Sequence, residues 1–527
     1  LKSLMHHVTI SRILFLICGG YLLLFPPRVG AQIADNIILN DARGARTDLV
    51  IRGESFWVSA PGLSVLPMQT GLYHNSKFSW GPNLGSVWLG NGYTQSLSGG
   101  IRFNSRFLDV QMRPILLTSE NRYFTQPLDG DRYTGQDLEK YEWVSGNIDA
   151  PGMIDDHAFS RLMPGDSWVK LKLWKLAGGI STENLWWGPG KRSSLLMSNN
   201  APGFWHITGH TTSPIDLYAF DIESQVAVGL LEPSWGLDDH RADYRVVFNG
   251  IVVSLRPRFD KNLRIGLIRT FILNENDIMS NRGYFPLFQP FLKGNLQLRD
   301  DGTPNDPDDQ RASVFVSWAF PRANFHIYGE YARDDHNVDL KDLYLQPNHN
   351  RAFMFGAQKR WIDTRGIWSL TTEVTQLEST NTKVVRWFET FYTHTRVERG
   401  YTNRGQHLGS HFGHGSNGWY SSLYRNEGPW TVGAVFERVA RNKELYQWIK
   451  DTRKPAQPEI ERTLGLVGWY RAGRVDIGLE VYRVAVQDRY IVGIRPDFEG
   501  AQRESYDPVN FNVQLVVTYR PGTGWRR

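Results

Sequence analysis

Residues 312–378 contain a strand–turn–strand–loop unit twice. In residues 314–320 apolar side chains fall at every second position, which is the period of a pleated strand. Residues 321–324 interrupt the pattern and 325–331 resume it, so the two runs are expected to pair as an antiparallel hairpin. After a long polar loop, a second hairpin spans residues 351–375. Strands are also expected at residues 86–92 and, as the last strand, at residues 509–519, where apolar and polar side chains alternate.

The connections between the expected strands alternate between short turns and long loops. Short turns are expected at residues 426–429 and 471–474, and long loops at residues 441–460 and 487–508. Strands of about ten residues, joined by short turns on one side and long loops on the other, are typical of an outer-membrane β-barrel. The sequence therefore predicts an all-β fold, a large antiparallel transmembrane β-barrel of about 18 strands.

The N-terminus has the pattern of a secretory signal peptide. Lys2 and Arg12 precede or open an apolar stretch at residues 13–25, and Val29-Gly30-Ala31 supplies a small-residue cleavage site. We expect residues 1–31 to be removed and residues 32–527 to form a single barrel domain. Cys18, the only cysteine, lies in the signal, so a mature chain without it has no disulfide or cysteine-bound metal.

Composition fits this prediction. Aromatic residues make up 13 % of the chain, with 19 Trp and 50 Gly, and mean hydropathy is −0.40. After the N-terminus no apolar run is long enough for a transmembrane helix. Removing Lys2, Arg12 and Arg28 with the signal lowers the basic count from 59 to 56, against 54 acidic residues, and this balance argues against a nucleic-acid partner.

The alternating pattern lapses between residues 118 and 167. Residues 135–144 have the composition of a short helix, so a small, partly helical insert is expected here. Two placements remain open for it: a plug in the lumen or over the periplasmic mouth, and an ordered surface loop.

An unusual segment at residues 181–204 reads STENLWWGPGKRSSLLMSNNAPGF. Here the sequence resembles the capsule assembly protein Wzi family, whose members carry a motif close to ENLWWGPG followed by SLLMSNNAPGF. The resemblance covers roughly residues 110–415 in order. It continues through DDQ at 308–310, WAFP at 318–321, YGEYARDDH at 328–336, PNH at 347–349, YTH at 392–394 and GYTNRGQHLG at 400–409.

The resemblance implies an outer-membrane barrel of a Gram-negative bacterium that helps to attach capsular or exopolysaccharide to the cell surface. Its implied partners are that polysaccharide, outer-membrane lipid and other components of polysaccharide export. Neither an enzymatic activity nor a cofactor is expected. Two alternatives remain: a porin-like diffusion channel, favoured by the barrel size alone, and an outer-membrane enzyme acting on lipid or glycan.

The expected loop at residues 379–417 is the first candidate polysaccharide-binding site. It contains Arg396, Arg399 and Arg404 together with Tyr392 and Tyr401. Aromatic faces stack on the C–H faces of sugars and arginine forks pair with uronate carboxylates, so this loop suits an acidic polysaccharide. The alternative is a solvated charged loop with interfacial aromatic residues.

The second candidate is the motif itself, with Trp186, Trp187, Lys191 and Arg192. The tryptophans are candidates for a sugar platform, although adjacent tryptophans beside Gly-Pro-Gly more often anchor a turn at the membrane interface or wedge a loop inside a lumen.

Three histidines, at 407, 411 and 414, have helical spacing, but the glycines among them indicate a loop, so no metal site is expected. No arrangement of Ser, His and acidic residues suggests catalysis.

Overall fold

The computed structural model describes residues 51–52, 62–124, 148–154, 157–235, 245–276, 308–334, 344–380, 390–441, 443, 458–489 and 507–521. The expected signal peptide and the possible helix at 135–144 lie outside these residues. Within them no helix has the length and apolarity needed to cross a membrane.

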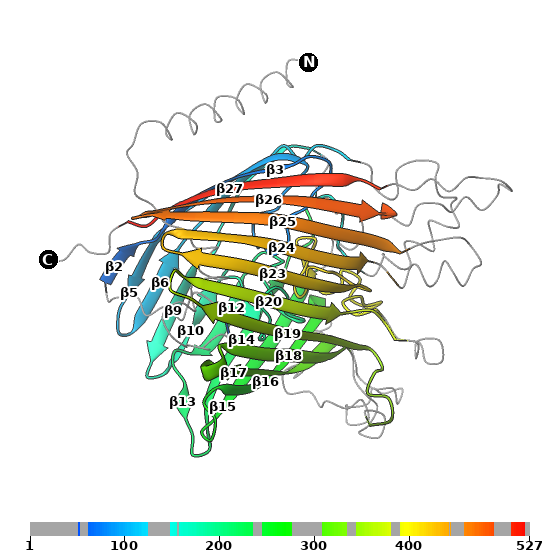
Figure 1. Ribbon diagram of the computed structural model, residues 1–527. Coiled ribbons are helices and arrows are strands. Elements are labelled where there is room, and N and C mark those ends of the chain that lie inside the picture. The colour runs from blue at the N-terminus through cyan, green and yellow to red at the C-terminus, as the bar shows by residue number, and fades with distance from the viewer. Residues whose placement is uncertain are drawn as a thin grey trace.

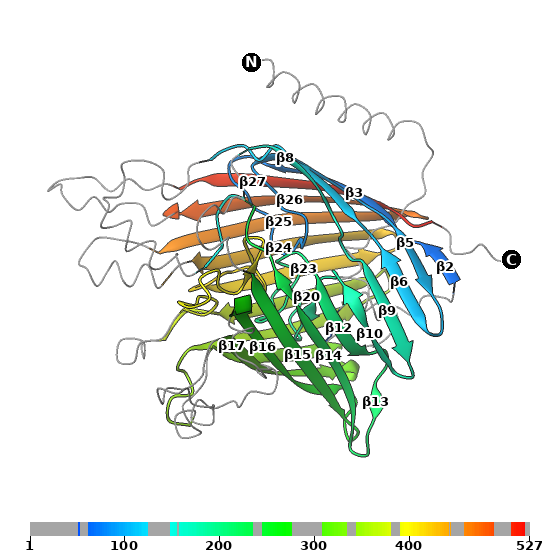
Figure 2. The same cartoon turned by 180° about the vertical axis from the view of Figure 1, so that it is seen from behind.

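Within the described residues, antiparallel strands form one closed barrel (Figures 1 and 2). The first part of the wall consists of four interrupted strands. Their segments are β2 (Gly62–Val65) and β3 (Met68–Asn75), β4 (Gly92–Ser98) and β5 (Ile101–Asn104), β6 (Leu108–Met112) and β7 (Ile115–Ser119), and β8 (Phe159–Met163) and β9 (Trp168–Leu173).

The rest of the wall follows in chain order. It consists of β10 (Leu176–Ser181), β12 (His206–Thr211) with its extension β13 (Ile215–Asp216), β14 (Phe220–Leu231), β15 (Val246–Pro257), β16 (Leu263–Asn274), β17 (Asp309–Phe320), β18 (Phe325–Asp334), β19 (Arg351–Ile362), β20 (Ile367–Gln376), β23 (Asn417–Glu427), β24 (Trp430–Arg441), β25 (Glu459–Ala472), β26 (Val475–Gln487) and β27 (Val509–Tyr519). Pairing of β27 with β3 closes the ring. When each interrupted strand is counted once and β13 is counted with β12, the 23 barrel segments within the described residues make 18 strands, as predicted.

Proline or glycine marks each interruption. The breaks contain Pro67, Gly99-Gly100, Pro114 and Pro164-Gly165. Proline has no N–H for the ladder and glycine permits a sharp bend, so pairing stops there and the wall folds along a crease. On one side of the crease β9 continues the wall by pairing with β10, whereas on the other side β8 pairs only with β7 among the described residues.

The hairpin expected at residues 314–331 forms as predicted. β17 and β18 pair from Arg311–Asp334 to Phe320–Phe325, and a 3-10 turn, η6 (Pro321–Ala323), joins them. Side chains alternate between the two faces: Val314 is 50 % exposed on the outside and Phe315 is 1 % exposed inside. The last strand, β27, also forms where its alternation predicted it.

The outer face of the wall is apolar. Exposed leucine, valine and isoleucine side chains recur at alternate positions, for example Leu464 and Leu466 on β25 and Ile477 and Leu479 on β26. Exposing such a surface to water would be unfavourable. In a bilayer the apolar side chains face lipid, and the closed ring of strands satisfies the backbone N–H and C=O groups, so the fold is that of a membrane-spanning barrel.

Three segments fold into the lumen and fill it across its width. They are residues 76–91, 182–205 and 390–416, together called the lumenal plug. Gly85 N–H donates to Asn199 O (2.6 Å) and Ser198 N–H donates to Leu408 O (2.8 Å), which ties the segments together. A buried cluster combines plug and wall residues: Trp187, Leu195, Leu196, Met197, Phe204, Phe391, Tyr392, Val397, Tyr401, Leu408 and Phe412 with Phe248, Ile268, Phe315, Tyr328 and Met354.

Two expectations about these segments were wrong. Residues 86–92 were expected to form a strand, but Ser86 to Asn91 belong to the plug, and Leu89 packs there beside Tyr73 of the wall. Residues 379–417 were expected to form an exposed loop, yet residues 390–416 lie inside the barrel. Their aromatic side chains are buried against the other plug segment, which removes more apolar surface from water than an outward loop would.

The predicted insert at 118–167 is described in part. Thr118 and Ser119 end β7, and β8 lies wholly within the range, so these residues are wall. Asp149 contacts the plug through its N–H, which donates to Arg399 O (2.9 Å). Residues 125–147 lie outside the described part of the chain, and whether they form a plug or a surface loop stays a prediction.

Candidate functional site

Two wall carboxylates hold the motif segment at the centre of the lumen. Glu373 of β20 accepts hydrogen bonds from the backbone N–H groups of Arg192 (3.0 Å) and Ser193 (3.0 Å) and from the hydroxyl of Tyr328 (2.7 Å). Glu330 of β18 accepts one from Leu195 N–H (3.1 Å). Inward-facing carboxylates of the wall strands thus accept hydrogen bonds from backbone N–H groups of the irregular plug segment. Each buried carboxylate and each buried N–H group gains a partner in this way.

The Arg192 side chain reaches a third wall strand, β24, which lies two strands along the ring from β20. Its Nε and Nη2 donate to the two carboxylate oxygens of Glu437 on β24, at 2.7 and 3.1 Å. His411, from the other plug segment, lies 3.2 Å from the same carboxylate. Burial alone would lower the pKa of Arg192, but the nearby Glu437 carboxylate outweighs this effect. The pKa lies above its usual value, so the guanidinium stays charged. The predicted residue Arg192 is therefore a brace of the plug, and the backbone of Lys191 is held beside it by Glu373.

Tyr392 and Tyr401 form the centre of the 390–416 segment. Their rings are stacked, with centroids 5.8 Å apart and 7° between planes, and Arg311 of β17 lies over Tyr401 at 4.5 Å. The Tyr392 hydroxyl donates to Leu195 O (2.5 Å) and accepts from Ser410 N–H (2.9 Å). Both side chains are fully buried, so contact with a sugar would require the plug to rearrange.

The two tryptophans of the motif are buried as well. Trp187 has no exposed surface, donates from Nε1 to Gln225 Oε1 (3.0 Å) and packs against Phe248 of β15. Trp186 is 5 % exposed. A short two-stranded ladder joins β11 (Trp186–Trp187) to β1 (Ile51–Arg52). The two tryptophans therefore lie as expected for the alternative to a sugar-binding platform, in which they hold a loop inside the lumen.

Two histidines of the plug contact each other. His407 Nε2 lies 3.2 Å from His414 Nδ1, with the rings stacked at 5.5 Å. Burial lowers the pKa of His414 to about 4, with a further contribution from Arg441, and burial lowers the pKa of His407 well below its usual value. Both rings are neutral near pH 7, so one donates to the other. The described residues include no group of three or more His, Cys, Asp or Glu side chains arranged for a metal.

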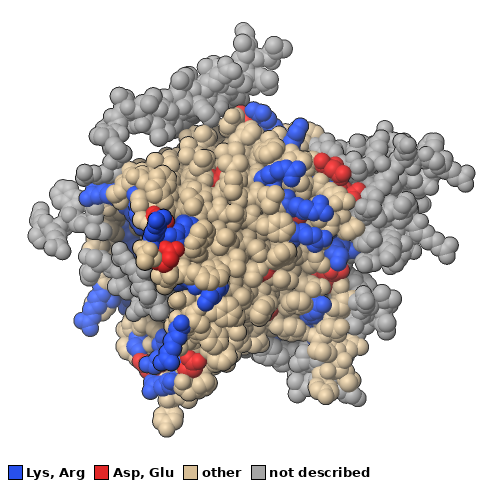
Figure 3. Space-filling view, in the orientation of Figure 1, with Lys and Arg blue, Asp and Glu red and all other residues tan. Residues whose placement is uncertain are grey.

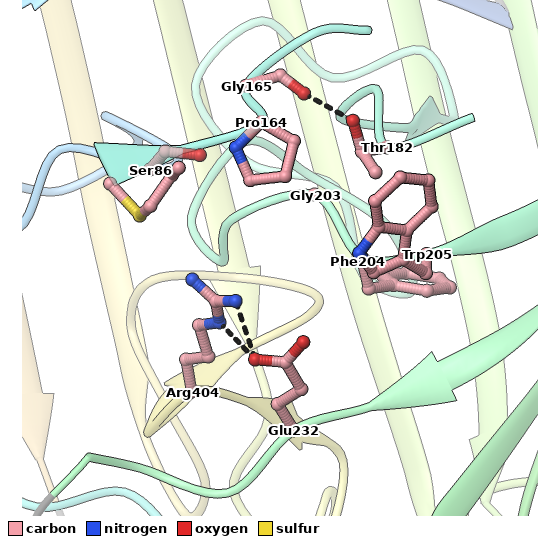
Figure 4. A pocket seen from close by; sticks show the side chains of 10 residues that line it. Ser86, Pro164, Gly165, Thr182, Gly203, Phe204, Trp205, Glu232 and Arg404 are labelled. Carbon is pink, nitrogen blue, oxygen red and sulfur yellow. Dashed lines mark hydrogen bonds and ion pairs between the residues drawn. The ribbon is translucent and has the colours of Figure 1, made fainter. Parts of the chain in front are cut away.

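A pocket lies where the unpaired side of β8 faces the chain that leaves β14 (Figure 4). Its water-accessible volume is about 10 Å³, room for about one water molecule. Arg404 enters from the plug and binds Glu232 through Nε (2.7 Å) and Nη2 (2.5 Å). The other lining residues are Ser86, Met163, Pro164, Gly165, Thr182, Gly203, Phe204 and Trp205.

Among the described residues, side chains rather than backbone hydrogen bonds span the gap between β8 and the chain that leaves β14, here called the seam. Trp235 receives Arg161 of β8 over its ring at 4.4 Å and Arg404 at 5.4 Å. Trp205, at the entrance to β12, is 53 % exposed and lines the pocket. The seam thus combines a guanidinium, a carboxylate and accessible aromatic surface, which are the groups that bind sugars and uronates.

The structure separates the three arginines predicted to act together. Arg404 lines the seam pocket, Arg399 is 2 % exposed and donates from Nη2 to Leu231 O (2.8 Å), and Arg396 is exposed beside Asn274. Sequence reasoning did not single out Trp205, Glu232 or Trp235. Trp205 directly follows the motif, and that proximity was the available signal.

A family model for the capsule assembly protein Wzi matches residues 137–479, well over half of the chain. The chain belongs to the Wzi family. This confirms the resemblance of the motif segment. No curated protein sequence matches the chain.

Solved structures resemble the fold. Wzi of Escherichia coli, described as an outer-membrane protein involved in group 1 capsule assembly and a carbohydrate-binding β-barrel, is 12 % identical, with a TM-score of 0.53, and the match covers 85 % of this chain and 83 % of that one. A BenF-like porin from Pseudomonas fluorescens Pf-5 is 9 % identical with a TM-score of 0.41, over 87 % of this chain and 98 % of the porin. At this identity the likeness to Wzi establishes the barrel fold, which agrees with the family assignment.

Proposed function

We propose that this protein lies in the outer membrane of a Gram-negative bacterium and holds an acidic capsular or exopolysaccharide at the cell surface without catalysing a reaction. Membership of the Wzi family carries this proposal. The crowded lumen supports it, because a barrel whose described residues cross the lumen from β15 to β24 is built to be rigid rather than to conduct.

The seam pocket is the proposed contact for the polymer. No described residue accepts a hydrogen bond from Nη1 of Arg404, so this guanidinium retains donor capacity beyond its pair with Glu232. Trp205 offers an exposed ring beside it for a sugar face. Each such contact is weak, and repetition along a polymer converts weak contacts into retention.

The proposal is tested by deleting the gene and measuring cell-bound against shed polysaccharide. We expect deletion to shift polymer from the cell to the medium, and an unchanged ratio would contradict the function. Turnover of labelled outer-membrane lipid or glycan by the purified protein would instead identify an enzyme.

The pocket is tested by Arg404→Gln and by Trp205→Ala. We expect each to weaken glycan binding by on the order of 1 kcal/mol, roughly fivefold, with a smaller effect at high salt for Arg404→Gln. Arg474→Gln is the matched control, since Arg474 is exposed in the short turn between β25 and β26. Binding by both pocket variants equal to wild type would remove the seam from the site and return attention to the exposed Arg396.

A further inference from the structure

Three arginines gather on the outer face of β24, β25 and β26, near the ends that lead into long connections. Arg438 lies three residues before the end of β24, Arg462 three after the start of β25, and Arg483 four before the end of β26. Arg438 and Arg462 are directly paired across the ladder, and Arg462 and Arg483 are diagonal neighbours. Figure 3 shows basic side chains gathered in a column over this part of the wall.

These charges lie close together with little local compensation. Like charges directly opposite each other on a sheet are destabilising. Among the described residues, Arg438 and Arg483 have no ion-pair partner, and Arg462 bonds only the neutral amide oxygen of Gln487, at 3.3 Å. Guanidinium groups on the lipid side of a barrel cost little only near the interface, where an anion can meet them.

The rest of this face is apolar. Two and four residues along β25 from Arg462 come Leu464 and Leu466, which is 70 % exposed, and two and four along β26 from Arg483 come Val481 and Leu479. Trp419 of β23, directly opposite Arg438, adds an exposed aromatic ring of the kind found at membrane interfaces. A ligand that covers the whole face must carry negative charge at one end and apolar chains at the other.

A second outward arginine pair shows what a satisfied arrangement looks like. Arg333 of β18 faces Arg351 of β19, but Arg333 Nη1 donates to Gln346 O and Pro347 O (3.0 and 2.9 Å), and Arg351 Nη1 lies 3.4 Å from Glu378 O. There the protein supplies its own acceptors. The β24–β26 arginines lack such acceptors among the described residues.

The geometry points to a binding site for a phosphorylated lipid of the outer leaflet, with its phosphates on Arg438, Arg462 and Arg483 and its acyl chains along Leu464, Leu466, Leu479 and Val481. This site, the headgroup clamp, rests on the outer-membrane location proposed above and is separate from the seam pocket. The apolar face below the charges favours an amphipathic lipid over a soluble anionic polymer. Long loops of outer-membrane barrels face outward, which places the clamp at the level of the outer-leaflet phosphates.

The test uses the full mature protein in detergent and native mass spectrometry with diphosphorylated lipid A and with the same lipid after removal of both phosphates. The variant carries Arg438→Gln, Arg462→Gln and Arg483→Gln, and the matched control carries Arg258→Gln, Lys261→Gln and Arg474→Gln, which are exposed cations at the short-turn end. We expect the clamp variant to bind diphosphorylated lipid A at least tenfold more weakly than wild type and the control to bind like wild type. Both should bind the dephosphorylated lipid equally.

A soluble polyuronate in place of the lipid separates the two classes of anion. Unchanged lipid binding in the clamp variant would overturn the proposal. It would also be overturned if wild type bound the polyuronate as tightly as lipid A and the clamp variant lost that polyuronate binding. If the triple variant does not fold, as judged by the gel shift of the unheated barrel, Arg462→Gln alone is expected to lower lipid affinity several-fold while Arg474→Gln does not. This binding test uses purified protein, so its failure leaves the polysaccharide-retention assay unaffected.

Discussion

At the scale of single residues, the ion pair between Arg192 and Glu437 joins the plug to the wall strand β24. Arg192→Gln leaves the buried Glu437 carboxylate with His411 as its one side-chain partner among the described residues, so it should lower the free energy of unfolding by about 3–5 kcal/mol. Urea unfolding in detergent, followed by tryptophan fluorescence, measures it. The double variant Arg192→Gln with Glu437→Gln should lose less than the sum of the two single variants; additive losses would show that the pair does not couple.

The histidine contact gives a pH dependence. The pKa of His414 is about 4 in the folded protein and near 6.5 when unfolded, so between these values the unfolded state binds more protons. Burying the neutral His414 ring therefore costs no stability through protonation above about pH 6.5. The free energy of unfolding falls as the pH drops from about 6.5 toward 4. Unfolding midpoints measured from pH 7.5 to 4 should fall more steeply for wild type than for His407→Gln with His414→Gln, and parallel curves would contradict this.

Among the elements, the two plug segments at 182–205 and 390–416 are linked by the Tyr392 hydroxyl. Tyr392→Phe leaves the buried Ser410 N–H and Leu195 O without this partner, which should cost about 1–3 kcal/mol. Hydrogen exchange should also quicken at Ser410. Tyr470→Phe, on the outer face of β25, is the matched control and should change neither stability nor exchange. Equal exchange at Ser410 in wild type and Tyr392→Phe would mean that the hydroxyl does not hold the segments.

The strands could be predicted from the sequence and the plug could not. The alternation at positions 314–320 is a local pattern, and it predicts which side chains face lipid. The breaks at Pro67 and Pro164 follow because proline has no backbone N–H to donate to a neighbouring strand. The burial of Tyr392 depends on Leu195, 197 positions away, and an aromatic, glycine-rich segment has the same composition on a surface as in a lumen. The inward acids Glu330 and Glu373 fall at polar positions of the pattern, but their partners are set by the fold.

For the molecule as a whole, the plug predicts electrical behaviour. Its segments cross the lumen from Gln225 on β14 to Glu437 on β24, so the wild-type protein in a planar bilayer should show no large, steady conductance. Trp187→Ala removes the wedge beneath β15 and should raise the frequency of brief openings. A stable large pore in wild type would instead favour the diffusion channel considered from barrel size.

The pairing of β27 with β3 has a consequence for how the chain folds. Asn512 Nδ2 donates to Asn75 Oδ1 (2.9 Å) across a sequence separation of 437 residues, so the ring closes only after nearly the whole chain has been made. Loop closure of that length is slow, and until it happens both strands present unpaired N–H and C=O groups to other chains. The last step of assembly is therefore the one most exposed to aggregation, and a chain truncated before Val509 would keep that open edge permanently.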